Sequence, residues 1–405
     1  MKDRVIFHVD VNSAFLSWEA VYRIRECKAA MDLRDIPSAI GGDIAKRHGI
    51  ILAKSIPAKK YGVVTGESVT EALRKCPDLY LASPNFEIYH RSSEAFIGIL
   101  REYTPDIEQC SIDEAFMDVS GTRRLFGEPI ELAHTIRNRI REELGFTVNI
   151  GISDVKLLAK MASDFKKPDR VHTLFKSEIQ EKMWKLPVDD LIYVGKSTKK
   201  KLYSMGIRTI GELAKTDLSV LKNNLKSHGE LIWKFSNGID VSPVVSESEP
   251  NKGYGNSTTV SFDVTDAATA KKILLSLSEK VAGRLRDNNV KGESISVEIK
   301  DFNFYHSSHQ KTLPAATNIT AEIFKAAGEL FDELWDGTPI RLLGIQITKL
   351  KDKDESRQLS LFDDKDYEKL EAVDSAIDSI RERYGMDSVK RAAYIKGDIK
   401  HNPHS

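Results

Sequence analysis

The sequence predicts an α+β protein built from several domains. Its 405 residues exceed what one hydrophobic core usually serves, so we expect more than one domain. The first half mixes short apolar, strand-like stretches with helical spacing of apolar residues. A strand and helix pattern follows a stretch rich in Ser, Glu, Pro and Gly at residues 242–256, which reads as a linker. These patterns favour helices packed on one face of each sheet.

The elements of the first half follow from periodicity. Residues 5–10 form a short apolar strand, and a helix with Ser17 as its N-cap should follow. Strands are expected near residues 39–43 and 49–55, amphipathic helices over 83–103 and 130–144, and a strong strand over 146–152. Between about residues 172 and 237, short helical patterns are separated by Gly195, Gly206 and Gly211, which predicts a small helical domain.

The second half predicts the order strand, helix, strand, strand, helix, strand. A strand opens at Gly255, a long helix covers residues 267–288, and residues 294–300 alternate with period two. Aromatic residues at Phe302, Phe304 and Tyr305 precede the third strand, and a helix over 321–335 leads to the last strand. An amphipathic helix is expected over residues 367–384 in the tail.

Composition excludes several classes of protein. The chain is 41% hydrophobic and 30% charged, and no apolar run approaches the length of a membrane span, so we expect no membrane association. Strand-like sequence begins almost at once, without a secretory signal, and the three cysteines lack metal-ligand spacing, which fits a reducing cytoplasm. The 60 basic and 60 acidic residues cancel, so nucleic-acid binding would depend on local clusters of basic residues.

Two adjacent acids, Asp113 and Glu114, carry the strongest chemical signal. Neighbouring side chains on a regular strand point to opposite faces, but at a hairpin turn both can reach one cation. Without a cation the two carboxylates would repel each other, and hard oxygen ligands suit Mg²⁺. We therefore expect a hairpin with a magnesium site at its turn.

A third acid, Asp10, ends the first strand. Asp10, Asp113 and Glu114 together could hold two Mg²⁺ ions, which clamp the attacking and leaving oxygens of a phosphoryl displacement. The alternative is an exposed hairpin with ordinary surface acids, and either motif alone favours that alternative because surface carboxylates are common. The two motifs together favour the metal site.

These residues carry a resemblance to a known family. The stretch Phe7-His-Val-Asp-Val-Asn-Ser-Ala-Phe15 together with Ser111-Ile-Asp-Glu114 resembles the Y-family (translesion) DNA polymerases, in their bacterial DNA polymerase IV and UmuC-like branch. The resemblance runs from the N-terminus to about Leu350. It implies a right-hand polymerase with palm, small fingers, helical thumb and a βαββαβ little-finger domain. The implied boundaries are 1–16 and 80–165 for the palm, 17–79 for the fingers, 166–240 for the thumb, 241–254 for a linker, 255–350 for the little finger and 351–405 for a tail.

The resemblance also implies the roles of individual residues. Asp10, Asp113 and Glu114 would be catalytic and would bind two Mg²⁺ with the backbone carbonyl of Val11. Phe15 would be a steric gate against the ribose 2′-OH. Lys59 and Lys167 would bind the nucleotide. Duplex DNA would be bound by lysines of a helix-hairpin-helix-like element in the thumb, namely Lys196, Lys199, Lys200 and Lys201.

The tail carries a further motif of the family. Its residues Gln358, Leu359, Ser360, Leu361 and Phe362 resemble the bacterial peptide that docks in the β sliding clamp. Apolar anchors in a polar tail suit a pocket on a partner. The alternative is the start of a helix packed on the body.

Four positions that bear on nucleotide handling depart from the family pattern, namely Asn12, Ile56, Lys59 and Val155. Asn12 stands where many members have a second Asp, and Val155 stands where Asn is commonest. The segment Ile56-Pro-Ala-Lys59 replaces the usual Tyr-Glu-Ala-Arg, so Lys59 offers a point charge where an arginine offers a bidentate fork.

The predicted function is template-directed DNA synthesis by a monomer. Its partners would be primer-template DNA, deoxynucleoside triphosphates and the clamp, and it would serve damage tolerance. Two alternatives come from other classes. A nucleotidyl cyclase shares a palm-like two-metal site and would not depend on a primer. A non-catalytic, clamp-tethered DNA-binding protein would show no Mg²⁺-dependent extension.

Overall fold

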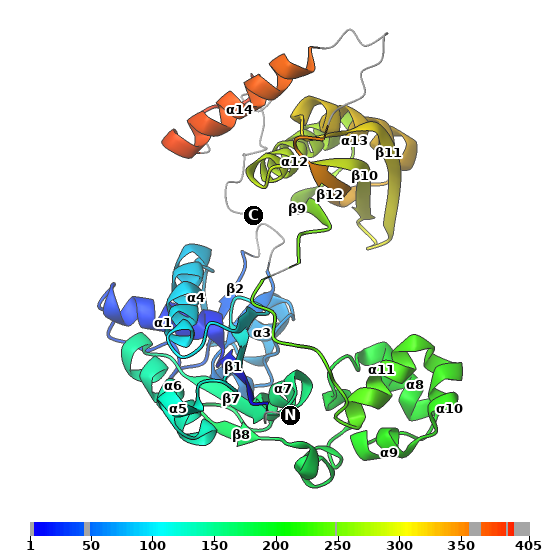
Figure 1. The fold of residues 1–405 in the computed structure, drawn as a ribbon. Helices are drawn as coiled ribbons and strands as arrows, with labels where there is room; N and C mark the ends of the chain where they lie inside the picture. Colours follow the sequence, from blue (N-terminus) through cyan, green and yellow to red (C-terminus); the bar gives the residue numbers. More distant parts are fainter. Residues whose placement is uncertain (1–3, 44–48, 248, 356–365, 386–387, 393–405) are drawn as a thin grey trace. The chain divides into compact units, whose positions relative to one another are not determined.

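The computed structural model describes residues 4–43, 49–247, 249–355, 366–385 and 388–392. The chain divides into two compact units (Figure 1). The first contains Met1–Gly42 and Gly49–Ser248, and the second contains Asp43–His48 and Glu249–Ser405. Each unit has its own hydrophobic core, as the length of the chain predicts.

The first unit is built on a five-stranded sheet. Its order is β5 (Ile107–Gln109), β6 (Glu114–Asp118), β1 (Ile6–Val11), β7 (Val148–Ser153) and β8 (Val171–Thr173). The central strand β1 runs antiparallel to β6 and to β7, and β7 runs parallel to β8. The expected strand at residues 5–10 and the expected hairpin around Asp113 are therefore present.

The two faces of this sheet carry different side chains because neighbours on a strand alternate. Phe7, Val9 and Val11 enter the main core with α4 (Phe86–Arg101) and α6 (Pro129–Arg139), which a π-helical turn, Ile140–Leu144, extends. On the opposite face, Ile6 and Phe116 contact Ala159 of α7 (Lys156–Asp164). Asp10 and Glu114 have the same parity as Ile6 and Phe116, so they belong to the α7 face.

A smaller sheet follows the first helix of the chain. Its order is β3 (Ile51–Lys54), β2 (Ser38–Gly41) and β4 (Tyr80–Ala82), and it packs with α2 (Ile56–Lys60) and α3 (Val69–Lys75). Helix α1 (Ala14–Arg25) is shared, because Trp18 enters the main core while Leu16 packs against the smaller sheet.

The expected start of α1 was wrong by one turn. Ser13 is the N-cap and the helix begins at Ala14, whereas Ser17 was expected to cap it. The Ser17 hydroxyl instead donates to the backbone carbonyl of Asn12 at 2.6 Å, as serine within a helix commonly does toward the preceding turn.

Short helices surround a further apolar cluster, which begins with Val155 and Leu157 at the start of α7 and continues to Ile232. They are α8 (Lys196–Ser204), α9 (Ile210–Lys215), α10 (Leu218–Leu225) and α11 (Ser227–Ser236), which pack on Leu202, Ile210, Leu221 and Ile232. Thr209 and Glu212 form a capping box that starts α9. The short helix α5 (Arg123–Phe126) lies elsewhere in the unit, between β6 and α6 in the chain.

The chain that leaves α11 returns to α7. A carboxylate oxygen of Asp240 accepts from the backbone N–H of Leu157, in the first turn of α7, at 3.0 Å. Lys156 donates to Glu108 on β5 and to the carbonyl of Pro243, and the backbone N–H of Val245 donates to Glu108 at 2.8 Å. The start of the predicted linker is thus attached to the first unit.

The second unit has the predicted order of strands and helices. Its sheet order is β11 (His306–Thr317), β10 (Val290–Asp301), β12 (Ile340–Asp352) and β9 (Gly253–Val264), antiparallel throughout. Helices α12 (Ala267–Asp287) and α13 (Thr320–Leu334) bury one face of the sheet. The tail helix α14 (Tyr367–Tyr384) has the bounds expected from its periodicity, and its Asp378 pairs with Arg286 of α12.

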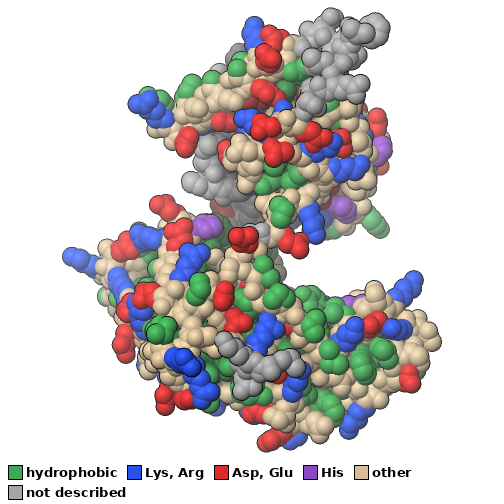
Figure 2. Space-filling model, in the orientation of Figure 1, with side chains coloured by type: hydrophobic (Ala, Val, Ile, Leu, Met, Phe, Trp, Pro, Cys, Tyr) green, Lys and Arg blue, Asp and Glu red, His purple; other side chains and the backbone are tan. Residues whose placement is uncertain are grey.

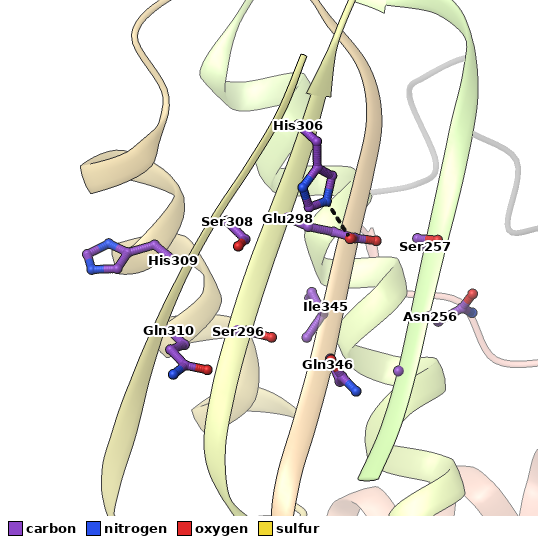
Figure 3. A pocket seen from close by; sticks show the side chains of 11 residues that line it. Asn256, Ser257, Ser296, Glu298, His306, Ser308, His309, Gln310, Ile345 and Gln346 are labelled. Carbon is purple, nitrogen blue, oxygen red and sulfur yellow. Dashed lines mark hydrogen bonds and ion pairs between the residues drawn. The ribbon is translucent and has the colours of Figure 1, made fainter. Parts of the chain in front are cut away.

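The other face of this second sheet is polar. A depression of about 890 Å³ is lined by side chains of all four strands, including Ser257, Ser296, Glu298 and His306 (Figure 3). His306 and Glu298 pair at 2.9 Å (Figure 3). Such a face offers many neutral hydrogen-bonding groups to a partner.

Two further observations concern the described residues as a whole. On the face shown in Figure 2, basic and acidic side chains are interspersed in both units, which agrees with the net charge of zero. None of the described helices combines the length and apolarity needed to cross a membrane.

Candidate active site

Strand register brings the predicted acids to one end of β1 and β6. Asp10 lies directly opposite Glu114 in the antiparallel pair. One residue further, the backbone N–H of Val11 donates to the carbonyl of Asp113 at 3.0 Å. Residues separated by about a hundred positions in the sequence are therefore neighbours, and both Asp10 and Glu114 project from the α7 face.

Asp10 is paired with a lysine. Lys167 Nζ donates to its carboxylate at 2.8 Å and also contacts Asp164 at 2.8 Å. Burial raises the pKa of the Asp10 carboxyl above its usual value, although the charge of Lys167 acts in the opposite direction. A cation close to Asp10 is therefore needed to keep this carboxylate ionised at low cost.

Glu114 has two basic neighbours. Lys160 Nζ lies 2.5 Å from its carboxylate, and His8 Nε2 lies 3.3 Å away. The close contact with His8 and the hydrogen bond from Lys160 hold the pKa of Glu114 at about 2, against the effect of burial. The contact with Lys160 is the shorter of the two and has the better hydrogen-bond geometry.

Asp113 occupies the turn between β5 and β6. The hydroxyl of Ser111 donates to its carboxylate at 2.6 Å. Serine two residues before an acid fixes the acid's side chain within the turn. Asp113 lines the same pocket as Asp10 and Val11.

The donor set fits a hard divalent cation. Three carboxylates and a backbone carbonyl are all oxygen ligands, which Mg²⁺ prefers. Among the described residues, no three His, Cys, Asp or Glu side chains are grouped as a metal site. Asp10 and Glu114 do not form such a group because each carboxylate points to a lysine, which supplies the positive charge.

A pocket of about 600 Å³ opens beside the acids. It is lined by six of the residues predicted for the site, namely Asp10, Val11, Phe15, Lys59, Asp113 and Lys167. Glu114 is not among the lining residues, since it faces His8 and Lys160. Arg34 and Lys54 also line the pocket and add positive charge, as an anionic substrate requires.

Sequence reasoning did not identify Arg34. This side chain hydrogen-bonds to Asp32 and donates to the backbone carbonyl of Gly145 at 2.7 Å. It lies in an irregular stretch between α1 and β2, and its place beside the pocket depends on that tertiary contact. No local pattern marks it.

Three comparisons with known proteins bear on this site. Residues 9–164 match the model of the impB/mucB/samB family, residues 251–361 match that family's C-terminal domain, and residues 189–240 match a thumb domain described for DNA polymerase-iota. The chain is 48% identical to DNA polymerase IV of Clostridium acetobutylicum over 397 residues, which cover 98% of this chain and 100% of that protein. It is 41% identical to DNA polymerase IV of Acetivibrio thermocellus, over 97% of this chain and 98% of that one.

The chain belongs to the impB/mucB/samB family of Y-family DNA polymerases.

A further relative and a solved structure agree. DNA polymerase IV 2 of Bacillus subtilis is 37% identical, over 98% of this chain and 95% of that protein. The structure of the Y-family DNA polymerase chimera Dbh-Dpo4(243-245)-Dbh matches with a TM-score of 0.72, over 85% of this chain and 99% of the chimera, at 21% identity. That likeness supports the predicted right-hand Y-family fold with palm, fingers, thumb and little finger.

In this Y-family fold, Phe15 forms one wall of the pocket. Its ring stacks on Tyr89 at 4.8 Å between centroids and makes edge contacts with Trp18 and Phe86. An aromatic ring held by three other rings has little freedom to move aside. It is therefore suited to exclude a substituent of the substrate.

Lys59 reaches the pocket from the short helix α2. Ser55 caps this helix by accepting from the backbone N–H of Ala58 at 3.1 Å. Lys54, on β3, donates to Thr65 at 3.2 Å, and its pKa is lowered by burial and by the charge of Lys59. A phosphate between the two lysines would relieve that repulsion.

The four predicted thumb lysines lie on α8, within the segment that matches the thumb model. Lys196, Lys200 and Lys201 are exposed. Lys199 is partly engaged, because it pairs with Asp189 at 2.7 Å and lies over the Tyr203 ring at 5.3 Å. The predicted clamp-binding residues, Gln358 to Phe362, lie outside the described residues.

Proposed function

We propose that this Y-family DNA polymerase adds deoxynucleotides to a primer 3′-OH under the direction of a template, with Mg²⁺ held by Asp10, Asp113, Glu114 and the carbonyl of Val11. The observation that carries the proposal is the register of β1 and β6, which places Asp10 opposite Glu114 and joins Val11 to Asp113. Membership in the family supports a DNA-directed DNA polymerase that depends on divalent metal.

When bound, two Mg²⁺ ions would lower the pKa of the primer 3′-OH and neutralise the triphosphate. The residues of the chain have the remaining tasks. Lys59 and Lys167 both line the pocket, so both can bind the phosphates of the incoming nucleotide. Lys167 already neutralises Asp10, and its positive charge would stabilise the leaving pyrophosphate.

Phe15 would select the sugar. Its ring is held in place by Tyr89, Trp18 and Phe86. A ribose 2′-OH directed at the ring would therefore clash with a side chain that cannot move aside. Sugar selection by exclusion needs a rigid group of this kind.

Duplex DNA would be held by the thumb and the little finger. Lys196, Lys199, Lys200 and Lys201 on α8 would contact phosphates without reading bases. The polar face of the second sheet would add neutral hydrogen bonds (Figure 3). We further propose cytoplasmic translesion synthesis by a monomer that a β sliding clamp recruits through Gln358 to Phe362.

Primer extension tests the proposal. We expect Asp113→Ala to abolish Mg²⁺-dependent extension while DNA binding survives, because the carboxylate is removed without altering the thumb. Asp78→Ala is the matched control, since that acid is exposed and does not line the pocket. Near-normal extension by Asp113→Ala would exclude this metal site, and wild-type activity without a primer would favour a cyclase.

A further inference from the structure

Asn12 is buried and its side chain is fully engaged. Its Oδ1 accepts from the Thr147 hydroxyl at 3.0 Å and from the backbone N–H of Asp169 at 2.8 Å. Its Nδ2 donates to Oδ1 of Asn149 at 3.2 Å. These contacts give Asn12 a structural role, and none of them is with the carboxylates of the site, although Asn12 also lines the pocket.

Asn149 continues the network into the next segment. This residue lies opposite Asp10 on β7 and is completely buried. Its Nδ2 donates to the carbonyls of Ser163 and Lys166 at 2.9 and 2.8 Å, and its Oδ1 also accepts from the backbone N–H of Arg170 at 3.2 Å. Nearly every hydrogen-bonding position of the two amides is therefore used.

The network fixes the orientation of both amides. Two carbonyls face the nitrogen of Asn149, so its oxygen must face Asn12. Asn12 must then present its nitrogen to Asn149 and its oxygen to the N–H of Asp169. Buried networks in which every group is satisfied hold a single geometry.

The two amides grip the chain on both sides of Lys167. Asn149 holds Lys166 and Arg170, and Asn12 holds Asp169. The turn between those points carries Lys167, whose Nζ lies 2.8 Å from Asp10. Both ends of the turn are attached to the strands that bear the site, β1 and β7.

We infer that Asn12 and Asn149 act as a pair of positioning residues that set the place of Lys167 in the nucleotide pocket. The inference rests on the proposed role of Lys167 in binding the triphosphate. It also accounts for the departure from the family pattern at position 12. An Asp at position 12 would place a carboxylate oxygen against Oδ1 of Asn149, where two acceptors would repel each other. Rotating the Asn149 amide by 180° would not help, because its oxygen would then face the carbonyls of Ser163 and Lys166.

The test is a double-mutant cycle between Asn12 and Lys167. Steady-state primer extension gives KM for the deoxynucleotide and kcat separately, and an equilibrium assay gives Kd for primer-template DNA. We expect Asn12→Asp to raise KM by roughly 10-fold and also to lower kcat, because the proposed Lys167 both binds the triphosphate and stabilises the leaving pyrophosphate, with the Kd for DNA unchanged. In the Lys167→Ala background, we expect Asn12→Asp to change KM by less than about 2-fold, because the group that it positions is gone.

A second variant and a control separate positioning from charge and from folding. Asn12→Ser adds no charge and is too short to join Asn149 to Asp169, so it should act in the same direction as Asn12→Asp. Asn288→Asp makes the same chemical change at the end of α12 in the second unit, where the side-chain nitrogen donates to the backbone carbonyl of Arg284 at 2.8 Å, and it should leave KM at the wild-type value.

Several results would overturn the inference. One is an unchanged KM in both Asn12 variants, and another is a loss of kcat alone. A third is the same rise in KM with and without Lys167, which would show that the added charge acts directly on the nucleotide. If Lys167→Ala itself leaves KM unchanged, the proposed role of Lys167 fails and the inference fails with it, whereas Asp113→Ala still tests the metal site independently.

Discussion

Gly151 should tolerate no side chain, because α7 lies directly against it. A Cβ built at this position in β7 would lie 1.9 Å from the carbonyl oxygen of Ala159 and 2.5 Å from the backbone nitrogen of Ser163. Both atoms belong to the backbone of α7, so no side-chain rotation relieves the clash. The helix as a whole must move away from the sheet.

The expected magnitude follows from that geometry. Overpacking a core usually costs about 1–3 kcal/mol, and we expect Gly151→Ala to reach about 3 kcal/mol because the clash is with backbone. For a unit of this size, that loss lowers Tm by roughly 6–12 °C. The displaced α7 also carries Lys160, so its 2.5 Å contact with Glu114 should be lost and primer extension should fall.

Urea unfolding followed by circular dichroism measures the first effect, and primer extension at a temperature where the variant is folded measures the second. Gly98→Ala is the control. Gly98 is exposed in α4 and its added Cβ would meet no atom within 4 Å, so this variant should be more stable than the wild type by about 0.5–1 kcal/mol. A Gly151→Ala variant as stable as the wild type would refute the reasoning.

Three further predictions concern the site and the thumb. Phe15→Ala should reduce the preference for deoxyribonucleotides over ribonucleotides by roughly 100-fold, measured as a ratio of kcat/KM values. Phe15→Tyr should retain that preference. Unchanged discrimination in the alanine variant would show that Phe15 is not the steric gate. The depressed pKa of Glu114, about 2, means that its ionised form stabilises the fold above pH 4.5 and that this contribution is lost as the pH falls toward 2. The difference in unfolding free energy between the wild type and Glu114→Gln, measured without divalent metal, should therefore shrink across that interval, and a constant difference would contradict the assignment. Lys200→Ala should lower the slope of log Kd for DNA against log salt concentration by about 1. Lys199→Ala should lower that slope by less, because Asp189 already neutralises Lys199. Equal slopes for the two variants would contradict this difference between the two lysines.

Much of the fold could be predicted because its signals are local. Alternation places Phe7 and Val9 on one face of β1 and Asp10 on the other, and helical spacing gives the bounds of α14. The start of α1 could not be predicted from capping preference alone. A serine can cap a helix or bond back to the preceding turn, and the tertiary position of Asn12 decides between them at Ser17.

The residues of the site likewise divide into those that a sequence motif marks and those that it does not. The acids and lysines that line the pocket, such as Asp10 and Lys167, belong to recognisable motifs. Arg34 and Asn149 do not, because each acquires its place through contacts with distant segments: Arg34 with Gly145, and Asn149 with Asn12 and Lys166. A single sequence holds no local pattern for such pairings.

The hydrogen bond from Leu157 to Asp240 has a mechanical consequence. Asp240 lies just after the last helix of the thumb. Leu157 lies in the first turn of α7, and the next turn of α7 carries Lys160, which pairs with Glu114. An α-helix of nine residues transmits displacement along its axis with little bending. Movement of the thumb's last segment must therefore either break this bond or drag α7, and with it the charge beside Glu114. Under the proposed function, the grip of the thumb on duplex DNA and the charge beside Glu114 would therefore be coupled through α7.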